Sequence, residues 1–213
     1  MSKNISKDII EKWLKGWSLS RNLPLPVTYK SGFKVDVGDE KQKSRYIFAE
    51  ANTDFFQLAQ SIHEPWVFLK VCTSFDDLKN KIPERWQLQP QGYMMSCFHR
   101  MNIIEVTLHK GYKMEFENYN STFVIKILTE NGEPASIGRV VLVDNLAIYD
   151  RISTEADHRR KGLATFLMKE LEKIALSKGI THNFLVATED GKALYQSLGW
   201  NVYSLYTSIV IPS

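Results

Sequence analysis

The sequence predicts an α/β fold built on a mixed sheet, with a smaller α+β unit in front of it. Short runs in which apolar and polar residues alternate recur along the whole chain. In residues 103–213 the expected elements follow the order strand, strand, strand, helix, strand, helix, strand. We therefore divide the chain into an N-terminal α+β unit, residues 1–102, and a C-terminal domain, residues 103–213.

The composition is that of an ordinary globular protein. Of 213 residues, 44% are hydrophobic and 24% are charged, and the net charge of +3 is too weak to predict a nucleic-acid partner. No apolar signal segment opens residues 1–8, and no run is long enough to span a membrane. We expect a cytoplasmic protein, monomeric or homodimeric, with no membrane or nucleic-acid partner.

The N-terminal unit begins with an amphipathic helix. Apolar residues from Ile9 to Trp17 recur at helical spacing, which predicts a helix over about residues 6–19. The other elements expected here are a hairpin of residues 27–37 and 45–49, a helix over 54–62, a strand over 66–71, a short helix opening at Ser74 and a strand over 86–98 that bends near Pro90. None of them carries a chemical motif.

The C-terminal domain has a tighter pattern. Asn131 and Gly132 form a hairpin-turn signature after the first clear strand, and Gly179 ends the long helix. The expected elements are strands over residues 123–128, 135–143 and 146–154, a long helix from about 160, a strand over 183–187, a short helix over 189–198 and a last strand over 202–211.

The segment of residues 152–165 is the one most suggestive of chemistry. A strand runs into a basic turn that opens the long helix, and the first amides of a helix have no internal partner and attract anions. Gly162 and Ala164 let a phosphate approach the backbone, and Arg159, Arg160 and Lys161 add positive charge. Three interpretations compete: a solvated basic helix start, a dinucleotide turn, and a pyrophosphate cradle for coenzyme A. The dinucleotide turn requires Gly-x-Gly-x-x-Gly and a parallel sheet, which the sequence does not predict.

Two motifs make the sequence resemble the GNAT superfamily of acetyltransferases. The family signature Arg/Gln-x-x-Gly-x-Gly/Ala is met by residues 159–164, and Leu194, Tyr195 and Gly199 are similar to its closing Leu-Tyr-x-x-x-Gly-Phe, with Trp200 in place of Phe. The resemblance runs from about residue 123 to the C-terminus. It implies a GNAT fold with a mostly antiparallel sheet, acetyl-CoA as the acyl donor and no metal.

The resemblance also implies which residues hold acetyl-CoA. The strands over residues 148–154 and 183–187 are parallel neighbours that splay apart, and the pantetheine arm lies between them. Amides of residues 160–165 hold the pyrophosphate. The acetyl-CoA-binding residues expected on this basis are Ile152, Ser153, Thr154, Arg159, Arg160, Lys161, Gly162, Leu163, Ala164 and Thr165.

Two side chains are candidates for proton transfer. Tyr195 matches the family tyrosine that protonates the departing thiolate; its other interpretation is a core aromatic. Asp150 is a candidate base, because period-two alternation puts it on the same face as Ile148 and Ile152. Alternatively, its carboxylate pairs with Arg139 or Arg151.

The chain departs from the family at the acceptor site. Between Tyr112 and Phe123 there is no room for the two helices that usually wall the pocket, so the N-terminal unit supplies the wall or the pocket is open. That unit is loosely similar to a degraded second copy of the fold. It lacks the cradle motif, and we expect it not to bind coenzyme A.

Cys72 and Cys97 are expected to be buried thiols, with a disulfide as the alternative, and no Cys or His spacing predicts a metal site. The predicted function is transfer of an acetyl group from acetyl-CoA to a primary amine of a small molecule or amino-acid-like metabolite. Two alternatives are acetylation of a protein N-terminus or lysine, and a non-catalytic sensor that binds coenzyme A.

Overall fold

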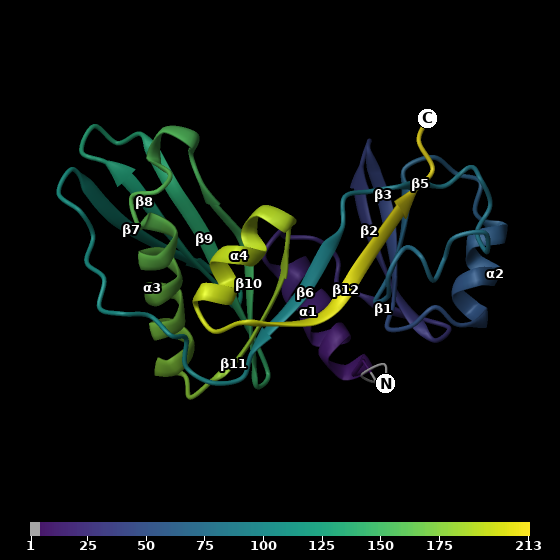
Figure 1. The fold of residues 1–213 in the computed structure, drawn as a ribbon, viewed down its shortest axis with the longest axis horizontal. Coiled ribbons are helices and arrows are strands. Elements are labelled where there is room, and N and C mark those ends of the chain that lie inside the picture. The colour runs from purple at the N-terminus through teal and green to yellow at the C-terminus, as the bar shows by residue number, and fades with distance from the viewer. Residues whose placement is uncertain (1–4) are drawn as a thin grey trace.

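A computed structural model describes residues 5–213. Residues 1–4 lie outside the described residues, and they are part of the segment, residues 1–8, in which we expect no signal sequence. The chain forms an elongated molecule with strands running through its whole length (Figure 1). The elements are α1 (Lys7–Leu19), β1 (Val27–Tyr29), β2 (Gly32–Asp39), β3 (Gln42–Phe48), α2 (Thr53–Ser61), β4 (Val67–Val71), β5 (Gln87–Leu88), β6 (Gly92–Cys97), β7 (Tyr112–Tyr119), β8 (Thr122–Thr129), β9 (Pro134–Val143), β10 (Leu146–Thr154), a 3-10 turn (Ala156–His158), α3 (Leu163–Ser177), β11 (His182–Ala187), α4 (Glu189–Ser197) and β12 (Asn201–Val210).

The strands join into one mixed sheet. Its order is β1-β2-β3-β4-β12-β6-β11-β10-β9-β8-β7, with β5 on β12. The pairs β3 with β4 and β10 with β11 are parallel, and the other pairs are antiparallel. The predicted class, a mixed and mostly antiparallel sheet with helices, is confirmed.

Two strands connect the halves of the chain. β6 belongs to the first 102 residues, yet it lies between β11 and β12. Residues 201–206 of β12 pair with β6, whereas residues 207–210 pair with β4 in the N-terminal part of the sheet. The sheet therefore continues across residue 102, and the domain boundary placed there stays a prediction.

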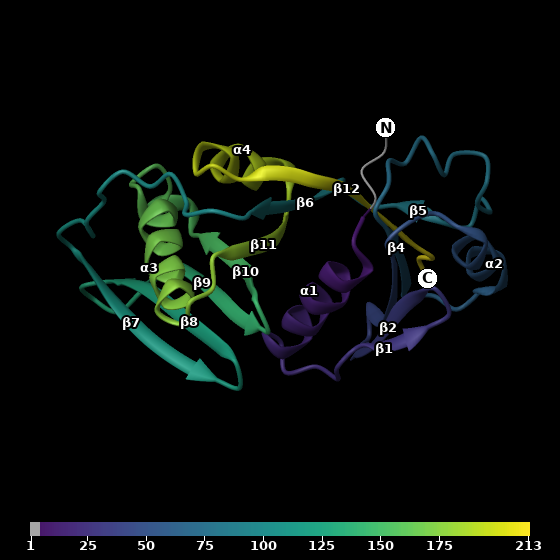
Figure 2. The ribbon, with the colours of Figure 1, turned by 90° about the horizontal axis from the view of Figure 1, so that it is seen from below.

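Helices cover both faces of the C-terminal strands. α3 packs on one face of β8, β9 and β10, and α1 packs on the other, between the two ends of the molecule (Figure 2). A Cβ atom at Gly16 of α1 would lie 2.9 Å from Cδ1 of Ile148, so this glycine lets α1 approach β10 closely. Helix α1 thus covers the face of β9 and β10 opposite α3, and the prediction that the N-terminal unit walls the acceptor pocket stays a prediction.

Three predicted elements differ in the structure. The strand expected over residues 27–37 is two strands, β1 and β2, which pair antiparallel around a turn at residues 30–31. The helix expected at Ser74 is a series of turns, because Asp77 accepts hydrogen bonds from the Ser74 hydroxyl and amide and Asn80 is left-handed, with φ of +66°. The strand expected over residues 86–98 is two strands, β5 and β6, separated at Pro90. A proline has no amide hydrogen to continue a ladder.

The expectation for the two cysteines agrees with the structure. Cys72 and Cys97 are buried free thiols, as predicted. Within the described residues, no helix is long and apolar enough to cross a membrane.

Candidate active site

A bulge in β10 opens a gap in the sheet. β10 and β11 pair in parallel from Leu146 to Tyr149, and the pairing stops there although β10 continues to Thr154. On the other edge, the register with β9 shifts between Asp150 and Ser153, and Arg151 is left-handed, with φ of +52°. Because a bulge bends its strand, β10 turns away from β11. The predicted splaying of this parallel pair is confirmed.

The gap is a cavity of about 450 Å³ between the end of β10 and helix α4. Thr188, the N-cap of α4, and Tyr195 of α4 line it. Of the residues predicted to bind acetyl-CoA, it brings together Ile152, Ser153, Thr154, Arg159 and Ala164.

The start of α3 is open to an anion. Gly162 is the N-cap, with φ of +71°; it offers no capping side chain, and no acidic residue lies in the first turn. The first amides of α3 are therefore unsatisfied by a cap. A second cavity, of about 710 Å³, is lined by Arg160, Lys161 and Gly162. The turn before α3 therefore lies between this cavity and the gap beside β10.

Two of the residues predicted to bind acetyl-CoA, Leu163 and Thr165, are buried or half-buried. The side chain of Leu163 is buried in the core, with 2% of its surface exposed, so it can offer a ligand only its backbone. Thr165 is half-buried in the first turn of α3. The structure gives its hydroxyl no protein partner among the described residues.

Tyr195 is both a core residue and a cavity residue. Only 7% of its surface is exposed, its ring centroid lies 6.0 Å from that of Trp200, and it lines the gap beside β10. Burial, with a smaller effect from Asp150, raises the pKa of Tyr195 to about 12. The phenol therefore keeps its proton at neutral pH, as a proton donor must.

Asp150 lies on the α1 side of the sheet. Its two carboxylate oxygens accept hydrogen bonds from Ser20 Oγ and, at 2.9 Å, from Arg21 Nη2. The partner is thus Arg21 rather than Arg139 or Arg151. Arg139 instead donates to the carbonyl of Ser20 at 2.9 Å.

The prediction that Asp150 and Ile152 share a face is wrong. The bulge at Arg151 interrupts the period-two alternation. Ile152 packs with α3, since its Cδ1 and Leu167 Cδ2 would lie 2.6 Å and 2.8 Å from a Cβ at Gly138. A left-handed arginine leaves no mark in the residue pattern, so alternation alone could not show the change of face.

A cationic cluster borders Asp150 and was missed in the sequence. The guanidinium carbons of Arg21 and Arg45 lie 4.7 Å and 3.5 Å from the centroid of the Trp17 ring. A cavity of about 430 Å³ is lined by Trp17, Arg21 and Arg151. The available signal was that Arg45 occurs at an inward position, two residues before the buried Ile47.

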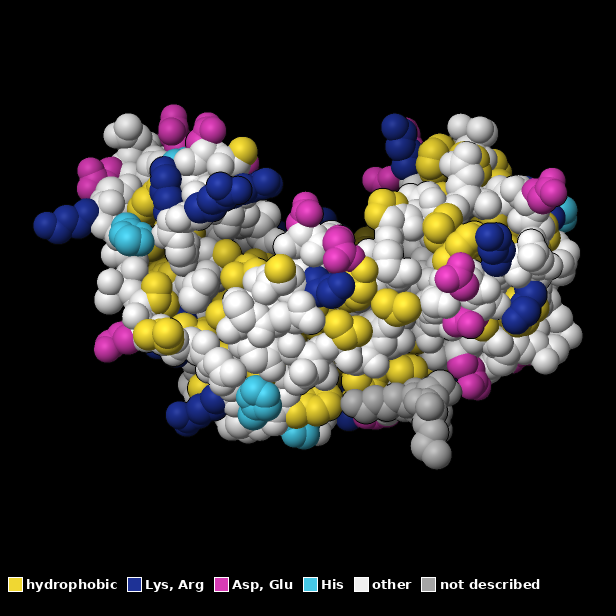
Figure 3. Space-filling model, viewed as in Figure 1, with side chains coloured by type: hydrophobic (Ala, Val, Ile, Leu, Met, Phe, Trp, Pro, Cys, Tyr) yellow, Lys and Arg dark blue, Asp and Glu magenta, His cyan; other side chains and the backbone are white. Residues whose placement is uncertain are grey.

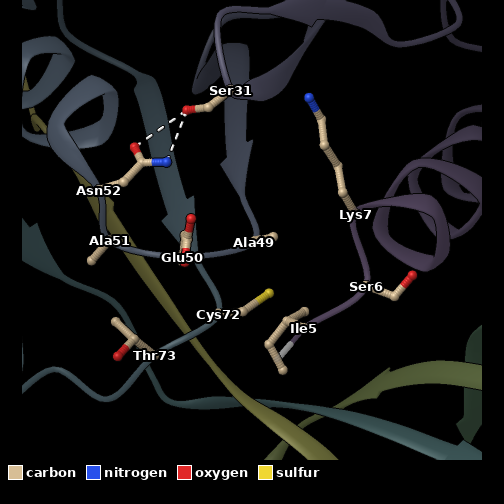
Figure 4. Close-up of a pocket in the computed structure, with 10 residues that line it drawn as sticks. All are labelled: Ile5, Ser6, Lys7, Ser31, Ala49, Glu50, Ala51, Asn52, Cys72 and Thr73. Atoms are coloured by element: carbon tan, nitrogen blue, oxygen red, sulfur yellow. Dashed lines mark hydrogen bonds between the residues drawn. The ribbon is translucent and has the colours of Figure 1, made fainter. Parts of the chain in front are cut away.

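A larger cavity, about 720 Å³, lies in the N-terminal half, between the start of α1 and the loop that joins β3 to α2 (Figure 4). Its wall at α2 is closed by polar side chains. Asn52 caps the helix by accepting from the Phe55 amide at 3.2 Å, and two hydrogen bonds join Asn52 to Ser31 (Figure 4).

No group of three or more His, Cys, Asp or Glu side chains suited to a metal ion occurs in residues 5–213.

Comparisons with known proteins agree with this geometry. The sequence profile described as "Acetyltransferase (GNAT) family" matches residues 86–200, more than half of the chain. The chain is 22% identical over 151 residues to the uncharacterized N-acetyltransferase YobR of Bacillus subtilis, covering 68% of this chain and 61% of that relative's length.

Solved structures show the same fold. The GCN5-related N-acetyltransferase from Kribbella flavida superposes with a TM-score of 0.69 at 12% identity, over 100% of this chain and 97% of that one. A tandem GNAT protein from the clavulanic acid biosynthesis pathway has a TM-score of 0.56 at 11% identity, over 72% of this chain and 66% of that one.

Proposed function

Because the chain belongs to the GNAT family of acetyltransferases, we propose that it moves an acetyl group from acetyl-CoA to a primary amine of a small molecule or amino-acid-like metabolite. The observation that carries the proposal is the gap between β10 and β11, which leads to the uncapped start of α3. An extended thioester arm fits the gap, and an anion fits the helix start.

The residues present suit the parts of acetyl-CoA. The amides that follow Gly162, with Arg160 and Lys161, offer donors and positive charge to a pyrophosphate. The main chain of Ile152 and Thr154 borders the gap where β10 has left β11, which suits the amides of a pantetheine arm. Acetyl-CoA supplies the activated acetyl group.

Tyr195 is the proposed acid. The amine nitrogen forms a bond to the acetyl carbonyl carbon, the carbon–sulfur bond breaks, and the sulfur leaves with the electron pair and takes a proton. The Tyr195 phenol lines the gap and is protonated at neutral pH, so it can donate to that sulfur.

The base that removes a proton from the amine is proposed to be Asp150, through water. Both of its oxygens already accept hydrogen bonds, so the carboxylate has a second role in holding Arg21. Replacing it with Asn and measuring turnover across pH separates the two roles: loss of a base removes the acid limb of the profile, whereas loss of positioning raises KM at every pH.

The amine is proposed to enter from the α1 side. The 430 Å³ cavity lies between Trp17 and Arg21 and the far end of β2 and β3, and Arg151 of the bulge borders it. The bulge thus separates this hollow from the acetyl-CoA gap, and Figure 3 shows the surface indented between the two ends of the molecule. We propose a small-molecule acceptor, no nucleic-acid or membrane partner, a monomer or homodimer, and a cytoplasmic location.

The test is calorimetry with acetyl-CoA followed by thiol release against a panel of amines and a lysine-containing peptide. Binding with turnover of small amines supports the proposal. Binding with turnover of the peptide alone would support a protein acetyltransferase instead, and binding without any turnover would support a sensor.

A further inference from the structure

The cations around Trp17 outnumber the carboxylates that could neutralise them. Arg21 pairs with Asp150 at 2.9 Å. Within residues 5–213, no carboxylate forms an ion pair with Arg45 or Lys70. The two guanidinium groups of Arg21 and Arg45 share one carboxylate and are thus left with excess positive charge beside the amine of Lys70.

Arg45 is buried without an ion-pair or hydrogen-bond partner in residues 5–213. It is 8% exposed, its Nε has no hydrogen-bond partner, and the guanidinium rests on the Trp17 ring at 3.5 Å. A buried, unpaired charge is costly, and a structure that keeps one usually pairs it with something. Stacking on an aromatic face returns only part of that cost.

Lys70 extends the cluster along one face of the sheet. Arg45 of β3 pairs with Phe68 of β4, and Lys70 pairs with Ser208 of β12, so Arg45 and Lys70 lie on the same face by alternation. Lys70 donates to Ser208 Oγ at 2.7 Å. Burial, and then the positive charges of Arg45 and Arg21, lowers the pKa of Lys70.

The cluster lies beside the proposed reaction site. Trp17, against which Arg45 and Arg21 pack, lines the 430 Å³ cavity together with Arg21 and Arg151. Asp150, which holds Arg21, is the last residue of β10 before the bulge. A molecule in this cavity therefore contacts Arg21 and Arg151 directly, and Arg45 lies against the Trp17 ring that lines it. The acetyl-CoA gap begins on the other side of the bulge, at Ile152.

We propose that the acceptor amine carries an anionic group, a carboxylate or a phosphate, which Arg45 and Arg21 bind with Lys70 beside them. This inference rests on the proposed function and narrows its substrate class. Guanidinium groups match both anions in geometry, so the structure favours the shared chemistry, and the test must distinguish carboxylate from phosphate.

The experiment compares matched amines. One arm pairs an amino acid with its carboxamide, and a second arm pairs an aminoalkyl phosphate with the amino alcohol; thiol release is measured with saturating acetyl-CoA. We expect the charged member of one pair to have a kcat/KM about 10- to 100-fold higher, the size typical of hydrogen bonds to charged groups. The arm with the larger ratio identifies the anion.

Variants assign the preference to Arg45. Arg45→Gln is expected to reduce the charged-to-neutral ratio about tenfold or more, and Arg45→Lys is expected to retain part of it. The matched control is Lys43→Gln, on the same strand, where an exposed lysine pairs with Glu64 at 2.8 Å. The control should leave the ratio unchanged.

Calorimetry decides the inference without turnover. The protein is first saturated with coenzyme A, which fills the α3 cradle, and is then titrated with inorganic phosphate and with acetate. Binding of either anion that is lost in Arg45→Gln and kept in Lys43→Gln supports the inference. Equal ratios for charged and neutral amines, together with anion binding unaffected by Arg45→Gln, would overturn it. Turnover of neutral amines would then leave the proposed acetyltransferase function intact.

Discussion

Two strand–helix–strand units in this chain share one plan and differ at the start of the helix. β3, α2 and β4 form the first unit, and β10, α3 and β11 form the second; in each, the two strands are parallel. β3 and β4 remain paired to Phe48 and Val71, and the Cys72 amide adds a hydrogen bond to the Phe48 carbonyl at 3.1 Å. β10 leaves β11 after Tyr149.

The helix starts differ in the same sense. Helix α2 is capped by Asn52 and has Asp54 in its first turn. The side chains of the chain itself therefore accept a hydrogen bond from a free amide and offset the positive end of the helix dipole. α3 starts at Gly162 with neither. The two units therefore differ in backbone arrangement: the proposed anion site lies at an uncapped helix start next to an unpaired strand end, and the first unit has neither feature.

The largest expected effect comes from separating the halves. A fragment of residues 103–213 lacks β6, which lies between β11 and β12, and lacks α1, which covers the apolar face of β9 and β10. We expect it to aggregate or to form a loosely packed state, measured by circular dichroism and size-exclusion chromatography. Co-expression of residues 1–102 should restore a folded product. A folded and fully active fragment would show that the shared strands are dispensable.

The next effect separates the two helix starts. Gly162→Glu places a carboxylate at the open amides and strains a left-handed position by about 1 kcal/mol or more, so acetyl-CoA binding should be lost while the fold persists. The matched control is Ala51→Glu, which puts the same charge beside α2 in the N-terminal cavity. Calorimetry should show that Ala51→Glu binds acetyl-CoA with unchanged affinity and that Gly162→Glu does not bind it. Loss of binding in Ala51→Glu with normal binding in Gly162→Glu would put the binding site in the N-terminal half.

A third effect concerns rate alone. Tyr195→Phe keeps the ring that packs on Trp200 and removes the proton donor, so turnover should fall by about 10²–10⁴-fold with little change in acetyl-CoA affinity. Because the pKa of Tyr195 is about 12, the wild-type rate should show no alkaline loss from this group below about pH 11. Equal turnover of the two proteins would reduce Tyr195 to a packing residue.

The smallest expected effect comes from the first unit, β3, α2 and β4, whose helix is capped. Asn52→Ala removes the cap of α2 and should lower the free energy of unfolding by about 1 kcal/mol, measured by urea titration. Acetyl-CoA affinity should not change. A drop in affinity larger than the loss of stability explains would mean that the N-terminal unit takes part in binding.

The sequence was sufficient for features that depend on local pattern. The strands that lead to the turn, helix α3 and the glycine at its start follow from alternation, helical spacing and residue type. The placement of β6 between β11 and β12, and of β12 between β6 and β4, was not predictable from the sequence. Pairing between strands that are distant in the chain depends on the whole sheet. The bulge at Arg151 and the stack of Arg45 on Trp17 arise from tertiary contacts that no local pattern records.

The central claim is that one of the two units binds acetyl-CoA and the other does not. Hydrogen–deuterium exchange with and without acetyl-CoA tests it directly, since it reports where amides become protected. We predict slower exchange in residues 152–165 and 188–195, which contain the lining of the gap and the start of α3. We predict no change in residues 49–52 and 72–73, which border the N-terminal cavity. Protection of residues 49–52 without protection of residues 160–165 would contradict the account.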